Sequence, residues 1–502
     1  MARAAIALSR RVEDFSRKSC RAFPLEELYR LGRGTGQDRL HLARLIHQEV
    51  AIRNAQLCKE LLLLPFGLAQ TEGVGRVVEC FSSYVDWLSA FPVPQEPKHD
   101  EDFTQLLEQI LQDNADVTRS LGTAVHEVKT ALGSAYEEVR PEVDLIMDRF
   151  FIKRIGLRFL IQHHIEAAQV VPGASGIIRS DVGVGEILRS AATEARKSVE
   201  DELGISPDVE VFGDGAEIPI TQSTHASTYA TGRGLGSSPN LVHNRHFTHV
   251  PSHVRFICFE LLRNACRAVA SNWQRRQLQE QQELLISVAD AAFKAGDGDN
   301  LPSYQSVPLG RAAVATLPFA VPSGMWKTNH GERPAPVRAI FAYGRDEVSI
   351  KVSDEGGGLP RSEVQTAWSY YTSGTHSHSA RPRHAQVDFH EPRELLQTAG
   401  VGLPLARLHA RYYGGDVVLK SMEGFGTDVY VFLHRLGQCC ENLPQGVRIS
   451  PAQQDSSVGG EASIRLLEAL GDMSEADVAF LTRRLHERRL RMQDSQSAAE
   501  DS

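Results

Sequence analysis

Apolar residues recur every three or four positions from Pro24 to about Ala168, which is the period of half-buried helices. Three stretches carry this pattern: Leu42, Leu45, Ile46, Ile52, Leu57 and Leu61; Phe103, Leu106, Leu107, Ile110, Leu111, Val117, Leu121, Val125, Val128 and Leu132; and Ile146, Phe150, Phe151, Ile155, Leu157, Leu160 and Ile161. Long amphipathic helices joined by short connections predict an antiparallel helical bundle.

Alternating apolar and polar residues follow this helical part. A helix from Thr193 is expected to lead into a strand at Asp208–Asp214. Val337–Tyr343 and Glu347–Ser353 alternate on either side of the turn Gly344–Asp346 and predict a strand pair. The expected fold class is therefore α+β, with a helical bundle followed by a domain of helices and strands.

The segment Phe256–Ala270 combines an apolar helical period with a polar stripe. Glu260 and Asn264 lie four residues apart, and Arg267 follows three residues later, so all three are expected on one edge of the helix. A carboxamide oxygen on such an edge suits Mg²⁺, which keeps water and phosphate oxygens in its coordination shell. A Glu and an Asn at this spacing also occur on ordinary solvated helix faces.

Three glycine-bearing segments follow that helix. Val348–Pro360 is a strand that ends at Asp354 and continues into a run of glycines, which lets backbone approach a ligand closely. Ala399–Arg407 places glycines before a helical run, where free backbone N–H groups could meet phosphates. Ser421–Asp428 is a glycine-rich turn between two strands. Each segment alone is weak evidence, but their order after the polar stripe indicates a nucleotide site.

Composition narrows the class of protein. The net charge of −9 and the pI near 6.1 argue against a nucleic-acid partner. No apolar run approaches the ~18 residues of a membrane span. Seven cysteines without a Cys-x-x-Cys pair predict free thiols in a reducing compartment. The basic, serine-containing residues 1–23 are compatible with a mitochondrial presequence.

The sequence resembles the mitochondrial kinases of α-ketoacid dehydrogenases, the pyruvate and branched-chain dehydrogenase kinases. The polar-stripe helix and the three glycine segments resemble the N-box, G1, G2 and G3 boxes of the histidine-kinase-like GHKL fold. Pro24–Gly32, Glu49–Pro65 and Asp148–His164 resemble segments of the family's helical N-terminal domain. The resemblance runs from about Pro24 to Leu433, with insertions.

This resemblance implies a two-domain, ATP-dependent and Mg²⁺-dependent protein kinase with a GHKL-type α/β sandwich. The implied substrate is a serine on the E1 α-subunit of an α-ketoacid dehydrogenase, with pyruvate dehydrogenase favoured and branched-chain dehydrogenase second. Phosphorylation would down-regulate that complex. The implied partners are this E1 subunit, the lipoyl-bearing E2 core and a second copy of the chain, with no nucleic acid and no membrane span. The implied location is the mitochondrial matrix.

The resemblance also assigns roles to residues of this chain. Glu260 is the expected general base, Asn264 the ligand of Mg²⁺, and Asp354 the acceptor for the adenine amine. The other expected nucleotide-binding residues are Arg267, Gly356, Gly358, Thr372, Ser373, Gly400, Val401, Gly402, Leu403, Gly426 and Thr427.

The expected domain organisation follows from these assignments. Its parts are a possible presequence at 1–23, a helical regulatory and lipoyl-interacting domain at 24–190, an ATP-binding kinase domain at 191–437, and a C-terminal tail with a helix pair at 438–502. Insertions are expected at about 215–245 and 272–336, and an ATP lid at 374–398.

The chain departs from the family pattern at several positions. Many members have a histidine four residues before the helix glutamate, where this chain has Phe256 and the nearest histidine is His253. The G2 box usually has three alternating glycines, and here Thr398 replaces the first. The tail lacks the Asp-Trp pair of pyruvate-type members.

Two other functions remain open from the sequence. One is a protein-histidine kinase or ATPase of the same fold, with His163 or His164 as phosphoacceptor. These lone histidines at a helix end are otherwise expected on a polar face or as C-terminal caps. The other is a non-catalytic scaffold, which the Phe256 and Thr398 departures would favour. His376 and His378 have the spacing of a zinc-ligand pair but no fitting cysteine or acidic partner, so a lid is favoured there.

Overall fold

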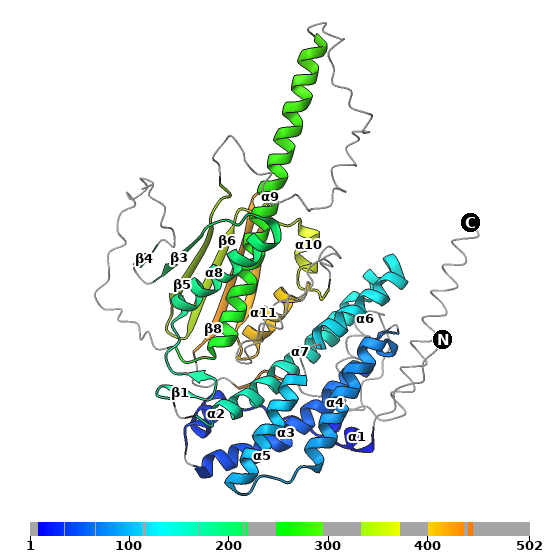
Figure 1. Cartoon of the computed structure of the whole chain (residues 1–502), viewed down its shortest axis with the longest axis vertical. Helices are drawn as coiled ribbons and strands as arrows, with labels where there is room; N and C mark the ends of the chain where they lie inside the picture. The colour runs from blue at the N-terminus through cyan, green and yellow to red at the C-terminus, as the bar shows by residue number, and fades with distance from the viewer. Residues whose placement is uncertain are drawn as a thin grey trace, which may run out of the picture.

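The computed structural model describes residues 9–34, 36–65, 67–113, 117–169, 171–213, 216–218, 247–294, 333–371, 400–435 and 440–444. In these ranges the chain forms a group of packed helices and, beside it, a sheet covered by helices (Figure 1). The predicted α+β class is confirmed. Thr372, Ser373, the lid at 374–398 with Thr398, and the predicted helix pair of the tail lie outside the described residues.

The first part of the chain is helical throughout. Its elements are α1 (Arg10–Ser16), α2 (Leu25–Gly32), α3 (Gly36–Leu62), η1 (Leu68–Gln70), α4 (Glu72–Ala90), α5 (Pro97–Asp113), α6 (Val117–Leu132), η2 (Gly133–Ala135) and α7 (Tyr136–Glu166). α3 packs against α4 and α7, and Leu42, Ile46 and Leu61 of its apolar stripe are fully buried, while Leu45 is partly buried. The helical periods of the sequence therefore predicted the core of this layer correctly.

A mixed sheet of six strands forms the second part of the structure. Its strands are β3 (Val209–Gly213), β4 (Ala216–Ile218), β5 (Val337–Tyr343), β6 (Glu347–Asp354), β7 (Asp416–Met422) and β8 (Gly426–His434). The strand order is β4-β3-β5-β6-β8-β7, with β3 and β5 parallel and the other pairs antiparallel. The strand pair predicted around Gly344–Asp346 is β5 and β6. The glycine-rich turn predicted within Ser421–Asp428 joins β7 to β8.

Helices cover one face of this sheet. α8 (Val184–Leu203) packs along α9 (Pro251–Lys294), and α11 (Gly402–Arg411) packs beside α9 (Figure 1). A short hairpin, β1 (Ala174–Ser175) with β2 (Ile178–Arg179), precedes α8, and α10 (Arg361–Thr366) follows β6.

Two boundaries expected from the sequence, the start of the insertion at 272 and the domain boundary at 190, fall inside helices of the structure. The polar-stripe helix and the polar segment after Asn272 form one continuous helix, α9, because no proline or glycine interrupts its run. The expected domain boundary between residues 190 and 191 falls inside α8, whose partners are α9 and β3.

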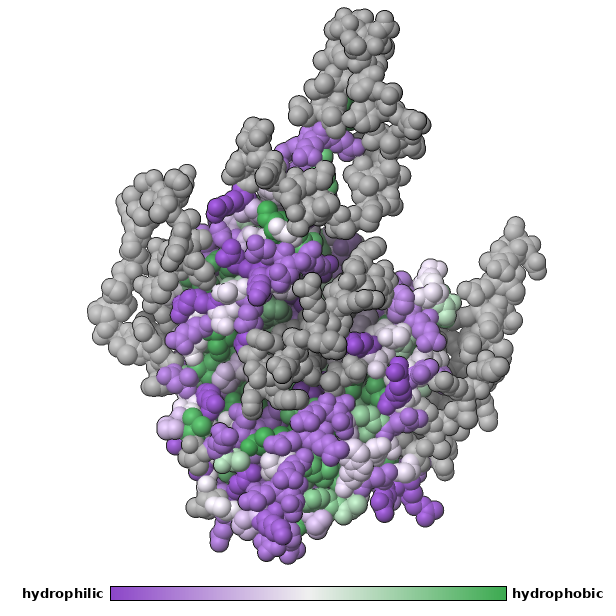
Figure 2. All heavy atoms as spheres, viewed as in Figure 1, coloured by the Kyte–Doolittle hydropathy of each residue, from purple (hydrophilic) through white to green (hydrophobic). Residues whose placement is uncertain are grey.

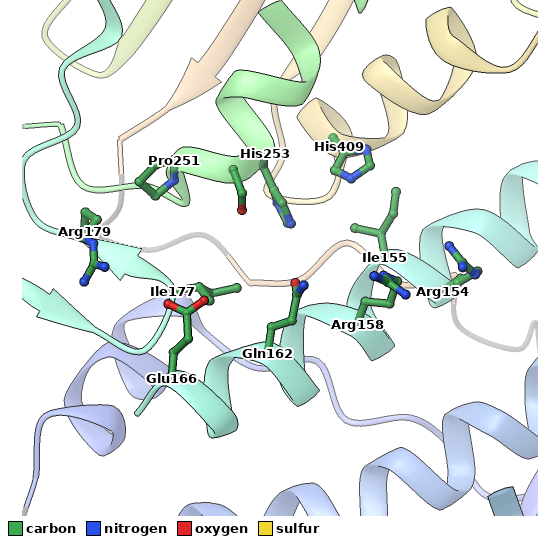
Figure 3. Close-up of a pocket in the computed structure, with 11 residues that line it drawn as sticks. Arg154, Ile155, Arg158, Gln162, Glu166, Ile177, Arg179, Pro251, His253 and His409 are labelled. Atoms are coloured by element: carbon green, nitrogen blue, oxygen red, sulfur yellow. The ribbon is translucent and has the colours of Figure 1, made fainter. Parts of the chain in front are cut away.

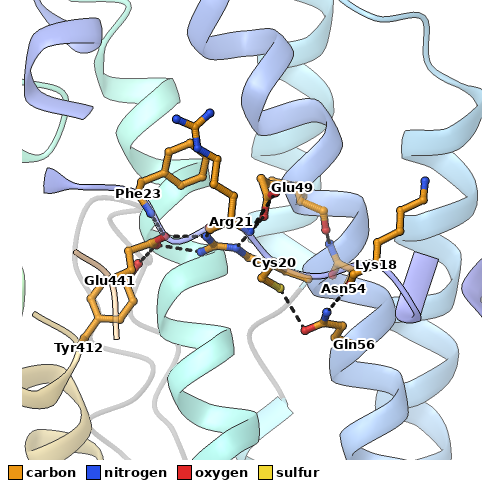
Figure 4. Close-up of polar contacts among 11 residues, drawn as sticks. Lys18, Cys20, Arg21, Phe23, Glu49, Asn54, Gln56, Tyr412 and Glu441 are labelled. Carbon is orange, nitrogen blue, oxygen red and sulfur yellow. Dashed lines mark hydrogen bonds and ion pairs between the residues drawn. The ribbon is translucent and has the colours of Figure 1, made fainter. Parts of the chain in front are cut away.

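A short segment after β8 returns to the helical layer. Its Glu441 accepts hydrogen bonds from Arg53 of α3 at 2.7 and 2.9 Å and from the Phe23 backbone N–H at 2.9 Å (Figure 4). The Tyr412 hydroxyl, just after α11, also donates to Glu441. Both Arg53 and Glu441 have fully buried side chains. This buried ion pair therefore connects the helical layer to the end of the sheet domain.

The visible surface is mainly hydrophilic. Purple side chains spread over both the helical layer and the sheet domain in Figure 2, with smaller apolar patches between them. Within the described ranges, no helix is both long enough and apolar enough to cross a membrane.

Candidate functional site

Glu260 lies on the buried face of α9, against the start of α11. Its side chain is fully buried, and a Cβ placed on Gly402 would come within 1.9 Å of Glu260 Oε2. Only glycine therefore fits at position 402 with the carboxylate in this place. Arg263 donates to Oε2 at 2.8 Å, while the buried Oε1 has no hydrogen-bond partner among the described residues.

The protonation of Glu260 is unusual. Burial raises the pKa of its carboxyl to about 7, and the neighbouring Arg263 guanidinium offsets only part of that rise. A carboxyl with a pKa near 7 can accept a proton and release it again at neutral pH. Glu260 therefore has the protonation chemistry of a general base.

Asn264 lies one helical turn after Glu260 and is exposed. One further turn along the same edge is Ala268, and a Cβ on Gly356 would come within 2.6 Å of Ala268 Cβ. The loop after β6 thus lies directly on the α9 edge that carries Glu260 and Asn264. A side chain larger than hydrogen at position 356 would push that loop away from the helix.

Asp354 ends β6 and is nearly buried, at 8% exposure. Its Oδ1 accepts from the backbone N–H of Gly356 at 2.8 Å and of Thr427 at 3.3 Å. Burial raises the pKa of its carboxyl to about 6, although both backbone donors lower it. These donors fix the orientation of the carboxylate between the two glycine-bearing loops.

The first and third glycine segments are joined by backbone hydrogen bonds. Gly357 N–H donates to the Phe425 carbonyl at 3.0 Å, and Gly424 N–H donates to the Gly357 carbonyl at 2.8 Å. A Cβ on Gly426 would come within 1.9 Å of the Asp354 carbonyl oxygen. Gly357 and Gly358 have φ values of 92° and 66°, which glycine adopts without strain.

Thr427 has its hydroxyl near a second hydroxyl. Thr427 Oγ1 lies 3.2 Å from Ser421 Oγ, which accepts from the Leu359 backbone N–H at 2.6 Å. Leu359 follows the glycines of the first segment, so this network braces the same loop. The Thr427 hydroxyl thus takes part in the network that holds that loop.

The second glycine segment lies at the contact between the two parts of the molecule. Gly400 has φ +89°, and its carbonyl accepts from the Tyr371 backbone N–H at 2.7 Å. Val401 is fully buried, and Leu403 is half-buried at the start of α11. Tyr371 has a positive φ of 56°, which is strained for a non-glycine residue, and its hydroxyl donates to the Thr118 carbonyl of α6.

Arg267 is turned away from these loops. Its guanidinium lies 3.1 Å from Glu202 Oε1 at the end of α8, and both side chains are substantially exposed. The structure therefore brings together Glu260, Asn264, Asp354 and the predicted glycines. It does not bring Arg267 to them, and Thr372 and Ser373 lie outside the described residues.

Phe256 has a histidine beside it from another element. The His409 ring of α11 lies 4.5 Å from the Phe256 ring and 4.9 Å from the His253 ring, measured between centroids. His409 Nδ1 contacts the Leu405 carbonyl oxygen at 2.8 Å, and neither histidine contributes to the pKa shift of Glu260. Burial and Arg263, not a histidine, therefore set the protonation of Glu260.

His163 and His164 are fully buried, and their predicted place on a polar face or as helix caps is wrong. His163 Nε2 lies 3.1 Å from the Leu28 carbonyl oxygen, and His164 Nε2 lies 3.2 Å from Asp100 Oδ1. The end of α7 is enclosed by other elements, which a helical period alone does not reveal. Neither ring presents a free surface to a phosphoryl donor.

Sequence reasoning missed Arg263 and Tyr371. Arg263 stands three residues after Glu260, so its helical spacing could have indicated the pairing. Tyr371 could not have been found this way, since its strained backbone and its contact with α6 depend on the packing of the two layers.

The comparisons with known proteins find similarity to kinases of α-ketoacid dehydrogenases. Residues 22–179 match the family model described as mitochondrial branched-chain alpha-ketoacid dehydrogenase kinase. That match covers most of the helical layer and ends before α8.

Whole-chain relatives extend the similarity to the sheet domain. The chain is 27% identical to the mitochondrial [pyruvate dehydrogenase (acetyl-transferring)] kinase of Arabidopsis thaliana, over 85% of this chain and 99% of the relative. It is 25% identical to the mitochondrial kinase of the same name from Drosophila melanogaster, over 79% and 78% of the two chains. It is also 25% identical to kinase isozyme 3 of Homo sapiens, over 87% and 88%.

Proposed function

We propose that this chain, which belongs to the family of mitochondrial pyruvate and branched-chain α-ketoacid dehydrogenase kinases, uses ATP to phosphorylate a serine of pyruvate dehydrogenase. The acceptor would be on the E1 α-subunit, and its phosphorylation would down-regulate the complex. Pyruvate dehydrogenase is preferred because the whole-chain relatives are named as its kinases. The family model of the helical layer is the branched-chain one, which makes branched-chain dehydrogenase the second candidate.

The observation that supports this proposal best is Glu260. Its carboxyl is buried against Gly402, its pKa is raised to about 7, and its Oε1 has no hydrogen-bond partner in the described part of the chain. A purely structural carboxylate in such a place would be expected to have its oxygens satisfied. We infer that Oε1 accepts the hydrogen bond of a serine hydroxyl and then takes its proton.

The other residues would hold the nucleotide. MgATP, when bound, supplies the phosphoryl group that is transferred. Asn264 is exposed one turn from Glu260 and offers a carboxamide oxygen to Mg²⁺. Asp354, held by the N–H groups of Gly356 and Thr427, would accept from the adenine amine. The glycines of the loops beside Asp354 and before α11 let these loops pack closely against α9 and against one another.

The finer assignments are part of the same proposal. We infer a GHKL-type ATP-binding domain from the order of the polar stripe and the three glycine segments. The helical layer would contact the lipoyl-bearing E2 core, the active form would be a homodimer, and the location would be the mitochondrial matrix. The relatives' names support a mitochondrial location.

Two substitutions on the same helix edge test the proposed roles. Glu260→Gln should leave MgATP affinity nearly unchanged and lower phosphoryl transfer by ~10²-fold or more, because it removes the base. Asn264→Ala should remove MgATP binding instead. The measurement is transfer of label from γ-labelled ATP to purified pyruvate dehydrogenase and, separately, branched-chain dehydrogenase, with nucleotide affinity measured by calorimetry.

The outcomes separate the alternatives. Acid-stable label on one α-subunit, lost in Glu260→Gln, would establish the activity and the substrate. Equal loss of nucleotide binding in both variants would contradict the assigned roles. Acid-labile label on the chain itself would indicate a histidine kinase, and absence of nucleotide binding in the folded wild type would indicate a scaffold.

A further inference from the structure

A cavity of about 190 Å³ lies between the helical layer and the sheet domain. α7 forms one wall, the first turn of α9 and the end of α11 form the opposite wall, and the β2 hairpin closes one side (Figure 3). His253, in the first turn of α9, precedes Glu260 by seven residues, which is about 10 Å along a helix. The cavity is thus separate from the loops around Asp354.

Positive charge dominates the lining of this cavity. Arg154, Arg158 and Glu166 project from α7 at spacings of four and eight residues, so they lie on one face of that helix. Arg179 of β2 reaches the cavity from the other side (Figure 3). Three guanidinium groups and one carboxylate leave an excess of two positive charges. Such an excess around a partly open cavity favours an anion with more than one charge.

A buried polar atom also points to a ligand. His253 is 7% exposed, lines the cavity, and has an Nδ1 without a hydrogen-bond partner among the described residues. Its ring is directed into the cavity in Figure 3. Burial, and then the neighbouring His409, lower the pKa of His253 well below its usual value, so the ring is neutral at pH 7. A neutral imidazole can donate one hydrogen bond to a ligand oxygen.

The beginning of α9 adds to this preference. Pro251 and Ser252, its first two residues, line the same cavity. The N-terminus of a long helix has a partial positive charge, which favours a bound anion. Pro251 has no N–H, and the N–H groups of His253 and Val254 donate to the Val250 carbonyl, so this preference comes from the charge of the helix end. The guanidinium groups, the buried histidine and the helix end therefore surround one space with donors and positive potential.

We propose that this cavity is a binding site for a phosphoryl group that carries two negative charges. Arginine side chains bind phosphate oxygens in pairs, and Arg158 and Arg179 approach the cavity from two elements. The bound group would contact both layers at once, because α7 belongs to one and α9 to the other. The source is either a free phosphate compound or a phosphoserine on a protein. The proposal does not depend on kinase activity.

Calorimetric titration of the full-length protein with inorganic phosphate tests the site. Saturating ADP is present so that the proposed nucleotide pocket is filled. Arg158→Gln and Arg179→Gln should each weaken phosphate binding by about 10-fold or more, as expected when a charged hydrogen-bonding partner is lost. Arg338→Gln removes the same charge from an exposed position on β5 and should leave binding unchanged.

Two further measurements identify the source of the phosphoryl group and verify that each variant is folded. A glycine-flanked phosphoserine peptide that binds at least about 10-fold more tightly than inorganic phosphate would indicate a protein ligand. Tighter binding of inorganic phosphate would indicate a small molecule. Arg158→Lys keeps the charge and should weaken binding less than Arg158→Gln, while circular dichroism verifies that each variant is folded. Absence of saturable phosphate binding, or equal binding in all folded variants, would overturn the proposal.

Discussion

Two buried glutamates, Glu441 and Glu260, have very different surroundings. Glu441 accepts hydrogen bonds from both terminal nitrogens of Arg53, from the Tyr412 hydroxyl and from the Phe23 backbone. Glu260 accepts from Arg263 alone, and its other oxygen has no hydrogen-bond partner in the described part of the structure. Burial is the same for both side chains, since neither is exposed.

The difference separates a fully paired carboxylate from one that keeps an unused oxygen. A buried charge that is fully paired and hydrogen-bonded is costly to disrupt, because its partner is then left charged in a dry environment. A buried carboxylate with an unused oxygen keeps a raised pKa and a capacity to bind something else. The region around Glu441 holds the two layers together, whereas Glu260 keeps an oxygen that no described residue uses.

The largest expected change in stability follows from replacing Glu441, the fully paired carboxylate. Glu441→Ala should lower the free energy of unfolding by about 3–5 kcal/mol, because the fully buried Arg53 loses its main counter-charge. Urea unfolding followed by circular dichroism measures it. Glu423→Ala, at an exposed turn position, is the matched control and should change stability by less than about 0.5 kcal/mol. Equal stability of both variants would mean that the ion pair contributes nothing.

Replacement of Glu260 should have the opposite effect and raise the free energy of unfolding above neutral pH. The pKa of Glu260 is about 7 in the folded protein against 4.5 for an ordinary glutamate, so the folded state keeps its proton longer than the unfolded state. Its contribution to stability is therefore greatest at low pH and falls as pH rises from 4.5 to 7. The glutamine of Glu260→Gln does not ionise, so this variant does not lose stability in this way as the pH rises. Its free energy of unfolding should therefore exceed that of wild type by as much as about 3 kcal/mol at pH 8.

Unfolding of wild type and Glu260→Gln at pH 5 and pH 8 measures this effect. The two proteins should differ more at pH 8 than at pH 5. Glu363→Gln, at an exposed position on α10, is the matched control. A constant difference between wild type and Glu260→Gln across this pH range would show that the carboxyl of Glu260 is not perturbed.

The smallest expected effect concerns the exposed pair of Arg267 and Glu202. Both side chains are partly in solvent, at 50% and 38% exposure, so Arg267→Gln should change stability by less than about 0.5 kcal/mol. Nucleotide affinity should also stay the same, because Arg267 is turned toward α8. A substantial loss of ATP affinity in this variant would return Arg267 to the nucleotide site predicted from the sequence.

Periodic patterns in the sequence were sufficient to predict most helices and strands and part of the candidate site. The helical period placed Glu260 and Asn264 on one edge of α9, since a backbone period fixes where each Cβ lies. The glycines around Asp354 were recognisable because a tight turn with positive φ needs them. Arg267 shares the same spacing, but the direction of a long side chain depends on its partner, here Glu202 of α8.

The sequence by itself determined the apolar stripes of the helical layer, the β5–β6 and β7–β8 strand pairs, and the order of the glycine segments. These are local properties, set by residues within a few positions of one another. Only the tertiary structure decided that Glu441 pairs with Arg53, 388 residues away, that His163 and His164 are buried, and that arginines of α7 and β2 surround one cavity. Such contacts depend on which surfaces meet when the layers pack, and no local pattern records that choice.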